Sequence, residues 1–292
     1  MIQYTGILLY SVNCPCHQLH SLGHYAQILH GMIRSGIYFF HIGDNVSLLF
    51  FHLSTALGDG SDDDLHLGYN SGEKQARKIV EQINRQKPDL VCIDGDLFDN
   101  EFEAVKNPKK VEKVLRDIKA KYGVYGCWGN HDVNEPILAG FTFDSSNSEN
   151  LLDKRMDQFV NDAGIKILND EIQLIDGKFY VVGRKDVARA KKIEGGRKTP
   201  QELLESLDQT KPIFVIDHQP KELQELADAG TDLDLCGHTH GGQIFPGNFA
   251  VDMGWENACG CLKKGKMYNI VTSGAGIWGP NMRIGSKSEI CV

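Results

Sequence analysis

Acidic, amide and imidazole side chains recur in short motifs that each follow an apolar run. The motifs are Asp64-x-His66, Asp96-x-x-Asp99, Asn130-His131, His218 and His238-x-His240. Because ligands of open α/β sheets bind at the carboxyl ends of strands, residues that follow several strands can converge on one place. Carboxylate, imidazole and amide oxygen together suit Mn, Fe or Zn rather than a soft thiolate site. The pattern therefore predicts a divalent-metal centre.

Asp96 is the centre of this pattern. It follows an apolar run at residues 90–93, and Gly95 lets the backbone turn beside it. A carboxylate has two oxygens, so Asp96 can contact two metal ions at once. In the two motifs with i, i+2 spacing, both side chains fall on one side of an extended segment.

Each motif alone also has an ordinary structural explanation. A Gly-Asp pair after a strand is usually a turn, and an Asn-His-Asp run is usually a loop. A Gly-His-x-His run suits histidines that are hydrogen-bonded at the edge of a core. Structural needs alone rarely produce all of these motifs in this order at strand ends, so the combination favours chemistry.

Apolar strands alternate with amphipathic helices, which predicts an α/β core. Late strands, including those expected over residues 267–272 and 283–291, suggest a second sheet. The basic, Gly-containing stretch 185–199 is expected to be a solvated loop. Apolar residues at helical spacing predict helices over 73–86, 108–120, 151–163 and 221–229, and Thr199-Pro200 begins another.

The start of the chain differs from the rest. Between residues 1 and 54 only Arg34 and Asp44 are charged, and the segment is rich in His. We expect an atypical, low-charge N-terminal extension over residues 1–45 and one domain over residues 46–292. A metal site in the extension and association of the extension with a membrane surface both stay open. Its most apolar window is too polar for a membrane-spanning helix.

Composition indicates a globular protein in a reducing compartment. The chain has 292 residues, of which 41% are hydrophobic, and its formal net charge of −8 argues against a general nucleic-acid binder. Its eight Cys include no CxxC pair, and the start lacks a signal-peptide pattern. We therefore expect a cytoplasmic protein, with peripheral membrane contact as an open alternative.

The order D-x-H, G-D-x-x-D, G-N-H-D, a lone H and G-H-x-H resembles that of the calcineurin-like metallophosphoesterases. The resemblance implies a four-layer α/β/β/α sandwich of two mixed sheets and two divalent metal ions, Mn foremost, with Fe or Zn as alternatives. It places Asp64, His66 and His240 on one metal, places Asn130, His218 and His238 on the other, and makes Asp96 the bridge. It further implies that His131 lies over the substrate and pairs with Asp99, while a hydroxide between the metals attacks phosphorus.

The motifs Asp-Leu-His-Leu-Gly and Gly-His-Thr-His-Gly-Gly-Gln look most like those of a bacterial branch of that family, whose members are often tied to membranes or envelope lipids. This implies hydrolysis of a phosphodiester or pyrophosphate, in a nucleotide-sugar lipid such as UDP-2,3-diacylglucosamine. A phosphomonoesterase acting on a soluble substrate is the alternative. Candidate pocket walls are Arg184, Lys185, Trp255, Trp278 and Arg283.

The chain departs from the family pattern in two places. Asn100 stands where many relatives have an Arg that contacts phosphate. Residues 55–63 separate the expected strand end His-Leu-Ser from Asp64, and deleting them would restore His-Leu-Ser-Asp-Leu-His. We expect an insertion that bulges outward and leaves Asp64 and His66 in place. The other outcome is a weakened first metal site and a metal-binding module without turnover.

Overall fold

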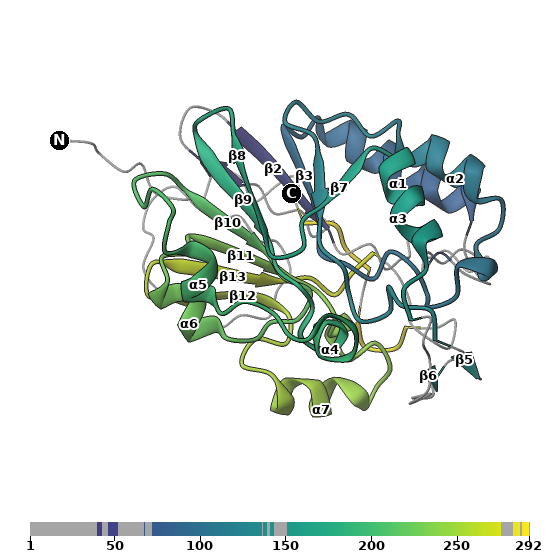
Figure 1. The fold of residues 1–292 in the computed structure, drawn as a ribbon. Coiled ribbons are helices and arrows are strands. Elements are labelled where there is room, and N and C mark those ends of the chain that lie inside the picture. Colours follow the sequence, from purple (N-terminus) through teal and green to yellow (C-terminus); the bar gives the residue numbers. More distant parts are fainter. Residues whose placement is uncertain are drawn as a thin grey trace, which may run out of the picture.

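The computed structural model describes residue 67 and the ranges 72–135, 151–275, 283–286 and 288–291, together with the backbone of four short strands at 40–42, 46–51, 137–138 and 141–142. Figure 1 shows two sheets lying between two groups of helices. Within the described ranges, every helix falls short of the length and hydropathy that a membrane span requires.

The first sheet has five strands in the order β1-β2-β3-β4-β7, of which β1 is antiparallel to β2 and the others are parallel. Its strands are β1 Phe40–Ile42, β2 Val46–Phe51, β3 Leu90–Ile93, β4 Val124–Gly126 and β7 Ile165–Ile167. One face carries α1 Glu73–Gln86, α2 Pro108–Leu115 and α3 Lys154–Asp162. Between α1 and α3 the chain also forms a 3-10 turn at Phe102–Ala104 and the short hairpin of β5 Ile137–Leu138 and β6 Phe141–Thr142.

The second sheet has six strands in the order β12-β13-β11-β10-β9-β8. Its central strands are parallel, and both edge strands are antiparallel to their neighbours. The strands are β8 Glu171–Ile175, β9 Phe179–Gly183, β10 Ile213–Ile216, β11 Leu233–Cys236, β12 Gly260–Lys264 and β13 Met267–Val271. Its outer face carries α5 Pro200–Leu204, which a capping box at Thr199 begins as expected, and α6 Leu223–Asp228.

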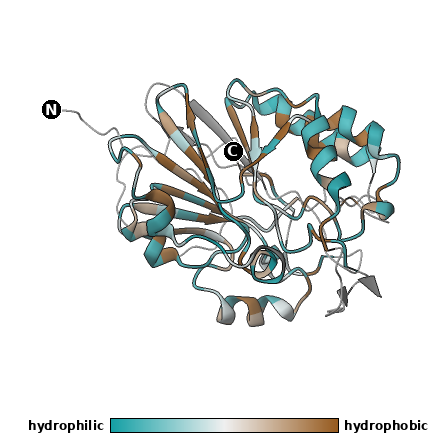
Figure 2. Cartoon of the chain, in the orientation of Figure 1, coloured by the Kyte–Doolittle hydropathy of each residue, from teal (hydrophilic) through white to brown (hydrophobic). Residues whose placement is uncertain are grey.

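Alternate residues of β3 divide the core into layers. Val91 and Ile93 join the cluster beneath the helices, whereas Leu90 and Cys92 join the cluster between the sheets. That second cluster also holds Phe214 and other apolar residues of the six-stranded sheet, whose central strands are largely brown in Figure 2. The predicted four-layer α/β/β/α sandwich is therefore confirmed.

Two segments differ from the sequence expectation. The stretch expected as a solvated loop contains α4 Val187–Arg189 and a π-helical turn at Ala190–Glu194. Asp186 caps this helix by accepting hydrogen bonds from two backbone N–H groups, and Arg189 lies 5.3 Å from the ring of Trp128. In place of the strand expected over residues 283–291, Ile284 and Gly285 form isolated bridges to Ile244.

Buried polar groups cross the outer face of the six-stranded sheet. Asp234 and Asn269 are neighbours in register on β11 and β13, and the Asn269 amide donates to Asp234 at 2.8 Å. Burial, reinforced by the nearby Asp217 carboxylate, raises the pKa of Asp234 to about 7 against the opposing charge of Arg184. An acid whose pKa rises on folding stabilises the fold only while it stays protonated.

We expect Asp234→Asn to gain stability over the wild type as pH rises. Below pH 4 the wild-type carboxyl is protonated in both states, and its contribution is lost as pH rises through about 7. The unfolding free energy of the variant minus that of the wild type should therefore increase by roughly 1–3 kcal/mol between pH 4 and pH 8. Urea unfolding at both pH values measures it, and a pH-independent difference would show that the Asp234 carboxyl does not titrate with a raised pKa.

Candidate metal centre

Candidate ligands follow β3, β4, β10 and β11 at one edge of the two sheets. They are Asp96, Asn130, His218 and His238. The strands that precede them are parallel within their own sheets, so their carboxyl ends lie together. The structure thus brings four of the sequence-predicted metal ligands to one place.

Two glycines let the loops after β3 and β4 touch. A Cβ added to Gly95, whose φ is +94°, would lie 2.6 Å from the backbone nitrogen of Gly129. A Cβ on Gly129 would lie 2.1 Å from Asp96 Oδ1. Only a residue without a side chain fits at either position. Asp96 itself has a φ of +52° and is 1% exposed, and its Oδ1 accepts from the backbone nitrogen of His131 at 2.8 Å.

Asp132 joins these same two loops. Its two carboxylate oxygens accept from the backbone nitrogens of Phe98 at 2.8 Å and Gly129 at 2.7 Å. Burial and the nearby Asp96 carboxylate raise the pKa of Asp132 to about 7. Asp132 therefore positions the loop that carries Asn130 against the loop that carries Asp96.

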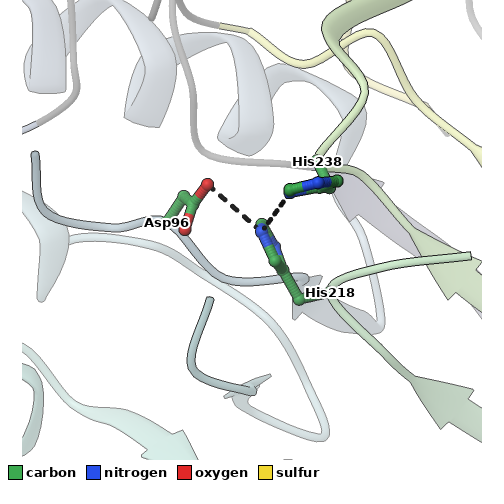
Figure 3. A group of neighbouring side chains, drawn as sticks. All are labelled: Asp96, His218 and His238. Carbon is green, nitrogen blue, oxygen red and sulfur yellow. Dashed lines mark hydrogen bonds and ion pairs between the residues drawn. The ribbon is translucent and has the colours of Figure 1, made fainter. Parts of the chain in front are cut away.

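His218 shows most clearly that the cluster fits a cation. Its Nδ1 donates to the carbonyl of Asp94 at 2.8 Å, so Nε2 points into the cluster. Around that one Nε2 lie His238 Nδ1 at 3.1 Å and Asp96 Oδ2 at 3.2 Å, which Figure 3 shows. Asn130 Oδ1 lies 2.8 Å from the same atom. A single proton on Nε2 can bridge to one of these atoms, whereas a metal ion can accept lone pairs from all of them.

The protonation of His218 agrees with this interpretation. Burial lowers the pKa of His218, but the Asp96 carboxylate, the charge of Asp186 and the carbonyl of Asp94 together outweigh burial and raise the pKa to about 10. The cluster therefore holds a positive charge on His218 when no metal supplies one. A metal that binds through Nε2 must displace that proton.

The imidazole of His131 is held by Asn100. The His131 Nδ1 lies 2.6 Å from Asn100 Oδ1, and the Asn100 backbone nitrogen donates to the His131 carbonyl at 3.0 Å. The turn at Asn100, which has a φ of +62°, directs its fully buried side chain inward. The Asp99 backbone nitrogen donates to the carbonyl of Leu67 at 3.4 Å. The pairing of His131 with Asp99 that the family resemblance implies stays a prediction.

Asn100→Ala is expected to lower kcat about 10- to 100-fold while the metal content and KM stay unchanged. The variant removes the oxygen that fixes the imidazole of His131, which then spends less time in its reactive orientation. Asn100→Asp keeps an acceptor oxygen and should retain most of the rate. Asn107→Ala changes another Asn with positive φ, 53°, which precedes α2, and controls for backbone strain. A loss of metal in Asn100→Ala would contradict this role.

The other predicted site residues that the structure describes differ in burial and in contacts. His240 is 6% exposed in the 3-10 turn His240–Gly242, and its carbonyl accepts from Arg283 at 3.2 Å. The Trp255 ring lies 5.3 Å from the ring of His238. Arg184 was a candidate pocket wall, but it is fully buried and paired with Asp217 at 2.7 Å, so it cannot line a pocket.

Asp64, His66, Trp278 and the predicted insertion at residues 55–63 lie outside the described residues. So does most of the predicted extension 1–45, of which β1 is described. The described residue next to His66 is Leu67, which is fully buried and bridges to Phe98 in the loop after Asp96.

Asn100 and Asp132 are site residues that the sequence interpretation missed. Asp132 directly follows Asn130-His131, so its position in the motif was a usable signal. The sequence marked Asn100 only as a departure from the family's Arg, because the turn that faces its side chain inward leaves no local pattern.

Comparison with known proteins agrees with this geometry. The sequence profile of the calcineurin-like phosphoesterases matches residues 37–242. An uncharacterized metallophosphoesterase of Campylobacter jejuni is 34% identical over 237 residues, which cover 78% of this chain and 56% of that protein. One of Aquifex aeolicus is 30% identical over 234 residues, covering 78% of this chain and 81% of that protein.

A more distant relative has a named substrate. The UDP-2,3-diacylglucosamine pyrophosphatase LpxG of Chlamydia trachomatis is 22% identical over 213 residues, covering 62% of each chain. The chain spans about half the length, 56%, of the Campylobacter and Helicobacter relatives that it matches. The matched profile covers more than half of the chain, and the chain therefore belongs to the calcineurin-like phosphoesterase family.

Proposed function

We propose that this chain is a metal-dependent phosphoesterase whose centre holds two divalent ions. The observation that carries the proposal is the convergence of three lone-pair atoms within 3.2 Å of His218 Nε2. Such a mixed oxygen and nitrogen set suits Mn, Fe or Zn, and we expect Mn. Family membership supports the same chemistry.

Asn130, His218 and His238 would hold one ion, and Asp96 would bridge to the other. Asp64, His66 and His240 would complete the second site. The bridge between Leu67 and Phe98 supports this part of the proposal, because it holds the residue after His66 beside the loop of Asp96. We therefore favour an insertion at residues 55–63 that leaves the ligands within reach.

When bound, the two ions polarise the phosphoryl group and lower the pKa of a water molecule. The chain's own contribution centres on His131. Because Nδ1 faces the oxygen of Asn100, Nδ1 carries a proton, and Nε2 is the atom that exchanges a proton with the leaving oxygen. We assign to Asn100 the orienting role that the family resemblance implied for Asp99.

For the substrate we propose a phosphodiester or pyrophosphate in a nucleotide-sugar lipid. LpxG, the named relative, acts on UDP-2,3-diacylglucosamine and supports this class. We further propose that the protein works in the cytoplasm. Cys92, Cys127, Cys236 and Cys291 are buried free thiols, which suits a reducing compartment.

The test compares chelator-treated protein before and after Mn is restored. We expect no hydrolysis of bis(p-nitrophenyl) phosphate without metal and full hydrolysis with Mn, with p-nitrophenyl phosphate cleaved more slowly. Faster cleavage of the monoester would favour the soluble phosphomonoesterase alternative. Metal-independent cleavage, or none with Mn bound, would overturn the proposal.

A further inference from the structure

Helix α7 Gly247–Gly254 exposes apolar side chains next to the metal centre. The α7 patch consists of Phe245, Phe249, Met253 and Ile284, which are 55%, 58%, 84% and 52% exposed. Phe249 and Met253 are four residues apart and thus share one side of the helix, and Phe245 lies just before its first turn. Figure 1 shows α7 at the periphery of the molecule, and Figure 2 shows brown residues on it.

Contacts within the α7 patch hold its side chains together. The rings of Phe245 and Phe249 lie 5.8 Å apart. The Phe245 backbone nitrogen donates to the Ile284 carbonyl at 2.7 Å, which fixes Ile284 beside them. No residue of α7 is buried, so the helix contributes nothing to the described core. A helix that keeps its apolar side outward needs another reason for that side.

The patch is directly connected to the candidate ligands. Trp255 ends α7, its backbone nitrogen donates to Val251, and its ring contacts that of His238. A Cβ on Gly242, in the turn that begins at His240, would lie 2.2 Å from Asn248 of α7. Whatever the patch contacts is therefore held beside the metal centre.

The size and charge of the patch favour lipid chains over a protein partner. Large apolar side chains present about 150–250 Å² each, so these partly exposed side chains offer roughly 400–600 Å². A stable protein partner needs about 800 Å² on each side. The helix carries one charged residue, Asp252, and the chain has a formal net charge of −8, so the patch itself offers no cation to an anionic surface.

We propose that the α7 patch docks into the acyl-chain layer of a membrane and holds the metal centre at the bilayer surface. An interfacial helix inserts its apolar side to the depth of the headgroup boundary. The consequence for substrate access rests on the proposed function: a lipid-linked phosphoester would meet the metals without leaving the membrane. Docking itself does not depend on hydrolysis.

The test is flotation of the full chain with neutral phosphatidylcholine vesicles. We expect the wild type to float, and Phe249→Ser combined with Met253→Ser to reduce the bound fraction at least about 10-fold. The matched control replaces two exposed apolar residues of β8, Ile172 and Leu174, by Ser, and it should float like the wild type. Adding phosphatidylglycerol or salt should not strengthen binding.

Hydrolysis of soluble bis(p-nitrophenyl) phosphate separates this inference from the proposed function. All three proteins should cleave it at rates within about twofold of each other, since surface changes rarely disturb the fold. Flotation of the α7 variant at the wild-type level would overturn docking. So would a dimer that forms in the wild type and in the β8 variant but not in the α7 variant. Selective flotation without any hydrolysis would leave docking supported and overturn the proposed function.

Discussion

Asp96→Asn is expected to lower kcat/KM for a phosphodiester by about 10³-fold and to reduce bound metal. The carboxylate lies 3.2 Å from His218 Nε2 and is the anionic member of the described cluster. An amide keeps an oxygen that can accept from the His131 backbone nitrogen, so the local fold should survive. The loss therefore reports on the negative charge and the bridging oxygens. Steady-state kinetics with Mn and metal analysis measure it.

The matched control is Asp234→Asn, which makes the same change at a carboxylate that is equally buried but lies on the outer face of the second sheet. It should keep the wild-type rate within about threefold. If Asp96→Asn retained more than about a tenth of the activity, Asp96 would not be the centre of the site.

Gly129→Ala is expected to remove most activity through a single methyl group. Its Cβ would lie 2.1 Å from Asp96 Oδ1 and 2.5 Å from the Asp96 backbone nitrogen, so the loops of β3 and β4 must separate. A displacement of about 1 Å in a catalytic group costs roughly 100-fold in rate. Crowding of this kind also destabilises a fold by about 1–3 kcal/mol. Kinetics and urea unfolding give the two values.

Gly72→Ala is the control for Gly129→Ala, because nothing lies within 4 Å of the Cβ that it adds. It should leave both rate and stability near the wild-type values. Wild-type activity in Gly129→Ala would show that the carboxylate does not need its present position.

The fold was predictable from the sequence because its signals are local. Alternating apolar strands and amphipathic helices led to the α/β sandwich, and Thr199-Pro200 begins a helix where expected. The motifs at strand ends also identified side chains that the structure brings together, including Asp96, His218 and His238. Parallel strands explain this, since the position of a residue at a strand end determines its place in space.

Other features depend on contacts that no local pattern reveals. Which neighbour orients His131 depends on a left-handed turn at Asn100. The basic stretch after Arg184 is helical because Asp186 caps it and Arg189 covers Trp128, which is distant in sequence. Helix α7 has little helical signal of its own, with Gly at both ends and apolar residues that stay exposed.

The most direct test of the central claim is a metal titration of chelator-treated protein. Bound Mn per chain and the rate of phosphodiester hydrolysis are measured in the same samples. We expect binding to end at two ions per chain, the rate to rise with the second ion, and protons to be released as His218 gives up its own. Full activity with one bound ion, or two bound ions without hydrolysis, would contradict the dinuclear centre around Asp96.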